Sequence, residues 1–217
     1  MMVAMVFVMI TMAKASAERV AELLSEKPDL HNPAQPVCEV KDGSIDFDAV
    51  DFSYKGDEHK LALRDVNLHI RSGQTIGILG GTGSAKSTLV QLIPRLYDAT
   101  EGTVRVGGRD VRGYDVNALR DAVGIVLQKN LLFSGTIREN IRYGRLDATD
   151  AEVEAAARTV SADQVAAKLE KGWDSDVGEG GDRLSTGEKQ LIPFARAVLA
   201  DPRIFVLDGA TSSIDTQ

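Results

Sequence analysis

A segment rich in glycine and hydroxyl side chains, Gly-Gly-Thr-Gly-Ser-Ala-Lys-Ser-Thr at 80–88, has the residue types needed to bind phosphate. Gly80, Lys86 and Ser87 fit the pattern Gly, four residues, Gly-Lys-Ser/Thr, whereas Ala85 stands at the second glycine. Successive backbone N–H groups can cradle an anion, Lys86 adds charge, and the Ser87 hydroxyl suits Mg²⁺. If position 85 requires a positive φ, the Cβ of Ala85 costs about 1–2 kcal/mol. The alternative is a glycine-rich turn with no binding role, in which the lysine is incidental.

A second candidate for chemistry follows the apolar run Ile204–Leu207, which ends in the carboxylate of Asp208. In a nucleotide-hydrolysing enzyme, the next position could hold a second carboxylate that orients water. Here that position is Gly209, and loss of a general base typically slows a reaction by roughly 10²–10⁴-fold. The residues that bind phosphate and Mg²⁺ do not include position 209. We therefore expect Gly209 to slow turnover more than it weakens nucleotide binding.

The elements that must position these residues can be predicted from hydrophobic periodicity. Alternation at 45–54 and 66–70 predicts strands, and Gly107-Gly108 predicts the turn of a hairpin. Further strands are predicted at 74–81, buried and leading into the glycine-rich segment, at 124–128 and at 203–208. Helices are predicted at about 86–96, 116–122, 136–143, 150–170 and 186–200, with capping boxes at 149–152 and 185–188. This order indicates a parallel α/β core with an antiparallel sheet beside it.

The composition is that of an ordinary globular protein, with 43% hydrophobic and 26% charged residues and a net charge of −7. The acidic balance argues against nucleic acid as a partner. Cys38 is the one cysteine, so no internal disulfide can form and a reducing compartment is expected. The histidines, His31, His59 and His69, lack the spacing of metal ligands.

The N-terminal 27 residues differ from the rest of the chain. Residues 1–13 are apolar and uncharged, but a bilayer span needs about 20 such residues. One interpretation is a signal peptide with Ala-Ser-Ala at 15–17 as its cleavage site, although no positive charge precedes it. The other, which we favour, is the end of a last transmembrane helix continuing into a connecting helix at 1–27. Three prolines at 28–42 predict a linker.

Together these motifs resemble the ATP-binding cassette of ABC transporters, specifically exporter half-transporters of the multidrug or lipid-exporter type. Tyr54 matches the aromatic residue that stacks on adenine, and Gln128 lies in a segment, 124–144, similar to that around the family's motif glutamine. Leu-Ser-Thr-Gly-Glu-Lys-Gln at 184–190 resembles the signature Leu-Ser-Gly-Gly-Gln. Ser-Ser-Ile-Asp at 212–215 resembles the loop that crosses to a partner cassette.

The resemblance implies an α/β P-loop NTPase with a parallel sheet core, an antiparallel β subdomain and a helical subdomain near 115–170, which transmits closure to membrane helices. It implies ATP and Mg²⁺ as ligands. The residues implied to contact ATP are Tyr54, Gly80, Gly81, Thr82, Gly83, Ser84, Ala85, Lys86, Ser87 and Thr88. The metal would be held by Ser87, by Gln128, which also positions water, and through water by Asp208. The signature residues implied to face the partner's ATP are Leu184, Ser185, Thr186, Gly187 and Glu188.

The function implied is coupling of ATP binding and hydrolysis to export of a substrate across the cell membrane, with the cassette on the cytoplasmic face. The implied partners are the transmembrane domain of the same transporter and a second cassette in a head-to-tail homo- or heterodimer. The family has a glutamate at the position of Gly209, so hydrolysis at this chain's own site is expected to be impaired. The alternatives are a degenerate, ATP-clamping half of a heterodimeric exporter and a soluble ABC ATPase acting on DNA or ribosomes.

Other departures from the family pattern are Ala85, Pro193 within a predicted helix, and Thr186 and Glu188 in the signature. A proline inside a helix removes a hydrogen bond and costs about 3 kcal/mol. Such departures indicate specialisation, decay or an erroneous sequence. A histidine that contacts γ-phosphate in the family would lie beyond Gln217. The expectation is therefore a fragment, with a C-terminally truncated cassette at 43–217.

Overall fold

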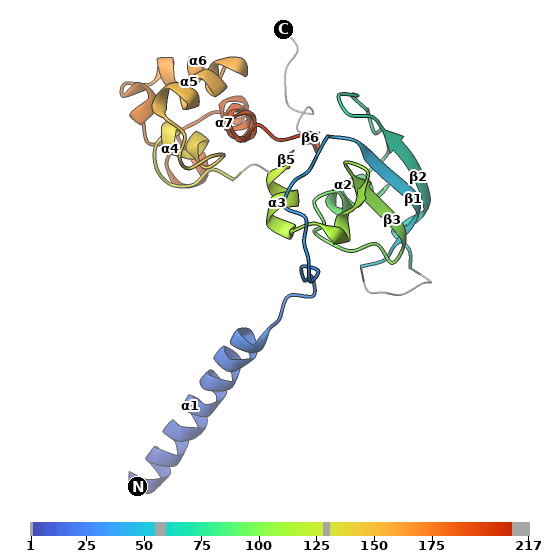
Figure 1. The fold of residues 1–217 in the computed structure, drawn as a ribbon. Coiled ribbons are helices and arrows are strands. Elements are labelled where there is room, and N and C mark those ends of the chain that lie inside the picture. The colour runs from blue at the N-terminus through green and yellow to red at the C-terminus, as the bar shows by residue number, and fades with distance from the viewer. Residues whose placement is uncertain (1, 55–59, 128–130, 210–217) are drawn as a thin grey trace. The chain divides into compact units, whose positions relative to one another are not determined.

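The computed structural model describes residues 2–54, 60–127 and 131–209. The chain forms two units, Met1–His31 and Asn32–Gln217. In the first unit, α1 (Met2–Ser25) is one helix of 24 residues, none of which is buried (Figure 1). Within the described part of the chain, no helix combines the length and the apolar character required to cross a membrane.

The larger unit contains an antiparallel sheet with the strand order β2-β1-β3-β4. These strands are β1 (Ile45–Phe52), β2 (Leu63–Ile70), β3 (Glu101–Val106) and β4 (Arg109–Asp110). Alternating side chains of β1, such as Phe47, are fully buried in a core completed by Leu92 and Ile93 at the end of α2 (Lys86–Leu92). The predicted turn is confirmed, since Gly107 and Gly108 have φ angles of 56° and 73° between β3 and β4.

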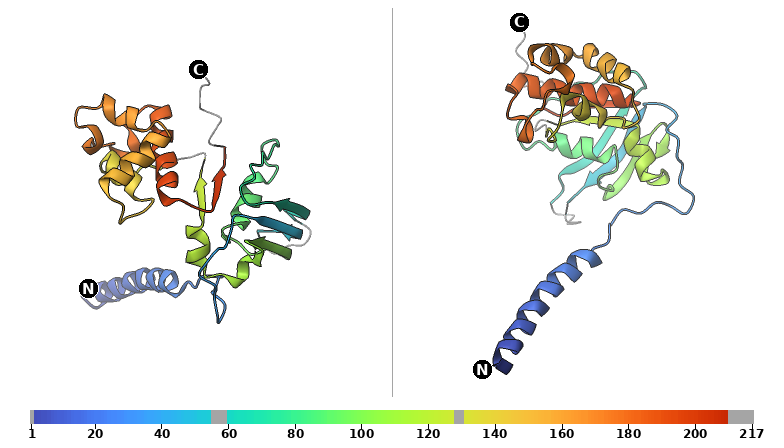
Figure 2. Two further views of the ribbon diagram at one scale, coloured as in Figure 1. Left: turned by 45° about the horizontal axis from the view of Figure 1, so that its top comes forward. Right: turned by 90° about the vertical axis from the view of Figure 1, so that its left-hand side faces the viewer.

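A second sheet consists of two parallel strands, β5 (Val123–Val126) and β6 (Ile204–Leu207), which lie side by side in Figure 2. α3 (Val116–Asp121) precedes β5 in the chain, and α7 (Thr186–Ala200) precedes β6. Val126 pairs with Leu207, so both strands end at the same edge of this sheet. The predicted α/β class, with parallel and antiparallel parts, is confirmed.

The prediction of a buried strand at 74–81 is wrong. The structure assigns no strand there, and Ile76, Ile78 and Leu79 are exposed, Leu79 by 97%. A strand requires a neighbour to accept and donate its backbone hydrogen bonds. In the described residues β5 and β6 pair with each other, and no strand pairs with 74–81. An apolar run alone therefore does not make a strand.

The remaining helices share a separate apolar core that contains Ile141, Val153 and Ile192. They are α4 (Ile137–Arg142), α5 (Asp150–Thr159), α6 (Asp163–Lys168) and α7, and 3₁₀ turns occur at η1 (Val111–Gly113), η2 (Gly172–Asp174) and η3 (Glu179–Gly181). Both predicted capping boxes are confirmed, at the starts of α5 and α7, and α4 has a third. The helix predicted at 150–170 is two helices, since Ser161 between them has a φ of 59°.

Part of the range predicted as a linker is hydrogen-bonded to the start of α3. The Val37 N–H donates to the Gly113 carbonyl at 3.1 Å, and the Val37 carbonyl accepts from the Asp115 N–H at 2.9 Å. The Asn32 side chain accepts from the Val116 N–H at 2.9 Å and donates to the Asp115 carboxylate. We call residues 32–37 the strap.

Candidate phosphate-binding site

The glycine-rich segment forms a tight loop that ends at the first residue of α2. Gly83 has a φ of 80°, and Ala85, the N-cap of α2, has a φ of 59° in the left-handed region. A Cβ built on Gly80 would lie 2.5 Å from Ser84 Oγ, so glycine at this position allows the close approach. Position 85 therefore does have a positive φ, and the Cβ of Ala85 costs about 1–2 kcal/mol.

The Lys86 ammonium lies within this loop and is held by three oxygen atoms. Lys86 Nζ donates to the Gly80 carbonyl at 2.7 Å, the Gly81 carbonyl at 2.9 Å and Ser84 Oγ at 3.1 Å. An ammonium has three donors, so these contacts can use all of them. The loop residues Gly81 to Ser84 are exposed, so an anion can approach the loop in which this charge lies.

Tyr54 lies beside the helix that follows the loop. Its hydroxyl is 2.8 Å from Thr88 Oγ1, and its ring packs edge-on against Phe52 and Tyr97 with centroid distances of 4.9 and 5.2 Å. The ring is nevertheless 54% exposed, and Ser87 is exposed as well, whereas Thr88 is buried. An exposed ring and an exposed hydroxyl therefore flank one loop, which suits a ligand that has both a flat base and phosphates.

Asp208 follows β6 directly, and its N–H donates to the Val126 carbonyl of β5 at 2.9 Å. Among the described residues no hydrogen bond joins Asp208 to residues 80–88, and the metal-binding role of Asp208 and Ser87 stays a prediction. Gln128 and the segment 212–215 lie outside the described residues. Gly209 has a φ of 64°, a conformation that strains any side chain placed there.

The signature segment forms the exposed start of α7. Ser185 is the N-cap, with its Oγ accepting from the Glu188 N–H, and the Glu188 carboxylate accepts from the Ser185 N–H at 3.0 Å and Oγ at 2.7 Å. These hydrogen bonds, with Lys168 Nζ at 3.3 Å, hold the pKa of Glu188 below its usual range. Leu184 is buried, while Thr186 and Gly187 are exposed. The exposed helix start remains available to a second chain.

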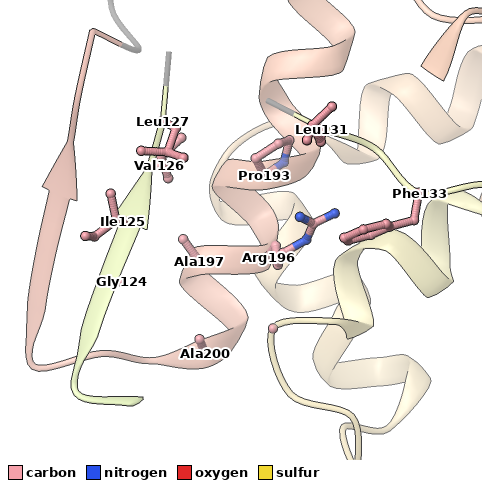
Figure 3. Close-up of a pocket in the computed structure, with 11 residues that line it drawn as sticks. Gly124, Ile125, Val126, Leu127, Leu131, Phe133, Pro193, Arg196, Ala197 and Ala200 are labelled. Atoms are coloured by element: carbon pink, nitrogen blue, oxygen red, sulfur yellow. The ribbon is translucent and has the colours of Figure 1, made fainter. Parts of the chain in front are cut away.

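A feature that the sequence did not suggest is a pocket of about 340 Å³ between β5 and α7. Figure 3 shows Arg196 and Pro193 of α7 directed toward Phe133 and Leu131, with Ala197 and Ala200 nearer β5. The helix continues through Pro193, which is buried. Reasoning from the sequence missed Arg196, because this residue belongs to no motif. The signal that could have identified it was a charged residue within an otherwise apolar helical stretch.

The phosphate loop fits the ligand that the resemblance implies. Gly80 stands where a Cβ would crowd the loop, Lys86 supplies a charge, and Ser87 has an exposed hydroxyl that suits a magnesium ion. Ala85 is the one residue of the loop that departs from the phosphate-binding pattern. Its positive φ strains the backbone, but its side chain is a single methyl group and does not fill the loop. The chemistry of these residues is therefore compatible with a nucleoside triphosphate and its metal.

Comparison with known proteins identifies the family of the chain. Residues 63–212 match the family model described as ABC transporter. The chain is 44% identical over 213 residues to an uncharacterized ABC transporter ATP-binding protein, YknV, of Bacillus subtilis strain 168, covering 98% of this chain and 35% of that one. It is 47% identical over 203 residues to a multidrug efflux ATP-binding/permease protein of Mycobacterium bovis, covering 94% of this chain and 17% of the relative.

Among solved structures, a bacterial Atm1-family ABC exporter with ATP bound superimposes with a TM-score of 0.88 at 36% identity. That match covers 98% of this chain and 37% of the exporter chain. The chain therefore spans only about a third, or less, of the length of these relatives.

Proposed function

The chain belongs to the ABC transporter family, and from that premise we propose that it is the ATP-binding, ATP-hydrolysing cassette of an exporter. In this role it couples ATP binding and hydrolysis to movement of a substrate across a membrane. The printed names of its relatives, a multidrug efflux protein and an Atm1-family exporter, support an export function. Its partners are a transmembrane domain of the same transporter and a second cassette.

In the proposed site each residue has a separate task. The backbone of residues 80–85 and Lys86 bind phosphate oxygens, and Tyr54 presents its ring to the base. Ser87 and Asp208, the latter through water, would hold a magnesium ion, which when bound would offset phosphate charge. Gln128 would orient water. Ser185 and the N–H groups that follow it would face the nucleotide of a second cassette in a head-to-tail dimer.

The observation that carries this proposal is the Lys86 ammonium held at 2.7–3.1 Å by its own exposed loop. Calorimetric titration of the chain with Mg-ATP tests it. We expect saturable heat, loss of that heat in Lys86→Ala, and its retention in Lys171→Ala, which removes an exposed lysine outside the site. Absence of heat from the folded, unsubstituted chain at millimolar Mg-ATP contradicts the proposal.

A second candidate function is an ATP-clamping half of a heterodimer, and Gly209 favours it. With no side chain at this position the chain has no general base there, while the loop that binds phosphate is retained. Such a half would bind ATP, hydrolyse it slowly and contribute its signature helix, α7, to the site of a competent partner. We propose that the cassette lies on the cytoplasmic face of a cell membrane in either case.

A further inference from the structure

Tyr97 is a surface aromatic residue to which neither the sequence motifs nor the proposed site assign a role. Its ring lies 5.2 Å from that of Tyr54, measured between centroids, and the two ring planes are at 88° to each other. Phe52 contacts both rings, at 4.9 Å from Tyr54 and 5.5 Å from Tyr97. Each of these three rings therefore packs against the other two.

The three rings differ in their exposure to solvent. Phe52 is 2% exposed and belongs to the core beneath the antiparallel sheet, whereas Tyr54 and Tyr97 are 54% and 41% exposed. A ring that served only to fill the core would be covered as Phe52 is. Tyr97 lies instead at the surface, beside the ring to which the proposed function assigns the base.

The turn that carries Tyr97 is held by buried contacts. Arg95, which is 5% exposed, donates from Nε and Nη2 to the two carboxylate oxygens of Asp98 at 2.7 and 3.0 Å. This bidentate pair closes the turn across Tyr97, and such pairs are among the stronger and more directional hydrogen bonds. The Arg95 carbonyl also accepts from Arg120 Nη2 at 3.1 Å. The backbone is therefore held on both sides of Tyr97.

Two hydrogen bonds join this turn to the segment that carries Tyr54. The Thr100 N–H donates to the Asp51 carbonyl at 2.9 Å, and the Ser53 N–H donates to Thr100 Oγ1 at 3.0 Å. Ser53 directly precedes Tyr54 in the chain. The contact between the two tyrosine rings is therefore made by two backbone segments that are themselves bonded to each other.

Edge-on packing restricts the rotation of an aromatic side chain. A side chain that must be immobilised when a ligand binds lowers the affinity by about two- to tenfold, because conformational entropy is lost at that moment. The hydroxyl of Tyr54 is bonded to Thr88 and Gln91, whereas Tyr97 contacts the ring itself. Removal of Tyr97 therefore withdraws a support from the Tyr54 ring and leaves these hydroxyl bonds in place.

We propose that Tyr97 is a positioning residue for recognition of the nucleotide base, and that it holds the Tyr54 ring in the orientation that stacks on the base. It acts through Tyr54 and makes no contribution to phosphate binding. The inference rests on the proposed function, since it takes Tyr54 to be the residue that receives the base. It makes the selection of a nucleotide over a base-free polyphosphate depend on Tyr97.

Calorimetric titration with Mg-ATP and with Mg-tripolyphosphate tests this inference, because the second ligand has the phosphates without a base. Tyr97→Leu should weaken Mg-ATP binding by about two- to tenfold and leave tripolyphosphate binding unchanged. Tyr97→Phe keeps the ring and should bind both ligands as the unsubstituted chain does. Tyr143→Leu is the matched control, because it alters another exposed tyrosine, one that packs on Phe133 at 4.7 Å, and it should change neither affinity.

A double-mutant cycle separates positioning from direct contact with the nucleotide. In a Tyr54→Ala chain, Tyr97→Leu should weaken Mg-ATP binding no further, since no ring is left for Tyr97 to hold. A further loss of the same size as in the unsubstituted background overturns the inference, because Tyr97 would then act independently of Tyr54. An unchanged ratio of the two affinities in Tyr97→Leu also overturns it.

The unsubstituted chain provides a second readout in case Tyr97→Leu does not fold. In NMR spectra of the chain with isotope-labelled tyrosine rings, the Tyr97 signal is assigned as the one missing from Tyr97→Phe. Mg-ATP should shift this signal and tripolyphosphate should not. Equal responses to the two ligands, in a chain that binds both, overturn the inference but leave the proposed function intact. If neither ligand binds, the proposed function itself fails, and this inference fails with it.

Discussion

The hydroxyl of Tyr54 lies 2.8 Å from Thr88 Oγ1, and this hydrogen bond joins the segment after β1 to α2. The two residues are separated by 34 positions in the chain. One carries an exposed ring, and the other is a buried residue in the first turn after the phosphate loop. The hydroxyl also donates to Gln91 Oε1 of α2 at 3.3 Å, and the ring packs against Phe52 and Tyr97, so several side-chain contacts hold the ring beside the helix that follows the loop.

We predict that Tyr54→Phe keeps most nucleotide affinity, because the ring remains, but lowers the free energy of unfolding by about 0.5–1.5 kcal/mol. Tyr54→Ala removes the ring and should weaken binding by about 1–3 kcal/mol. Urea unfolding and calorimetry measure the two effects. A double-mutant cycle with Thr88→Val should give a coupling energy of about 1 kcal/mol, and full additivity would show that the hydroxyl contact has no energetic role.

Ala85 offers a test of backbone strain in the phosphate loop. Its φ of 59° is costly for alanine and natural for glycine, so Ala85→Gly should raise the free energy of unfolding by about 0.5–1 kcal/mol after the entropic cost of glycine. The matched control is Ala155→Gly in the exposed face of α5, which should lower it by about 1 kcal/mol. Urea unfolding of both variants is the measurement. Equal destabilisation would place Ala85 in an ordinary helical conformation.

Gly209 is the position at which a general base would restore catalysis. Gly209→Glu in the intact transporter should raise ATP turnover by about 10²–10⁴-fold if hydrolysis is limited by the missing carboxylate. The φ of 64° predicts an accompanying loss of stability of about 1–2 kcal/mol, which Gly209→Ala should share without any gain in turnover. Equal turnover of the unsubstituted and Gly209→Glu proteins would exclude the ATP-clamping interpretation.

Glu188 makes the start of α7 sensitive to acid. Because the pKa of Glu188 is lowered in the folded chain, its contribution to stability is complete above the ordinary glutamate pKa and is lost as the pH falls through the lowered value. Glu188→Gln keeps an acceptor for the Ser185 N–H but removes this titration. We expect its unfolding free energy to fall less than that of the unsubstituted chain between about pH 5 and pH 3. Glu170→Gln, at another exposed glutamate, serves as the control.

Features that depend on neighbouring residues were predicted well. The capping boxes at Thr149 and Ser185 and the turn at Gly107-Gly108 follow from interactions within a few positions, and all three are confirmed. The consequence of Ala85 was also predictable, once its φ was known. Local sequence chemistry therefore gave most helix boundaries and the loop that carries the candidate site.

Features that depend on distant residues were not predictable. The apolar run at 74–81 is not a strand, because strand formation depends on a partner that no local pattern specifies. Arg196 lies in the apolar stripe of α7, where its neighbours are Phe133, Tyr143 and Asn140 from a separate segment. The roles assigned to Gln128 and to the partner-facing residues stay predictions.

The strap has a practical consequence for anyone who truncates the chain. A shortened protein that starts at Ser44 would expose backbone amides of Asp115 and Val116 whose acceptors, on Val37 and Asn32, had been deleted. Since each such bond contributes about 0.5–1.5 kcal/mol, the first turn of α3 would fray. A shortened recombinant protein should therefore begin no later than Asn32, whereas cleavage between Ser25 and Asn32 would spare all of these bonds.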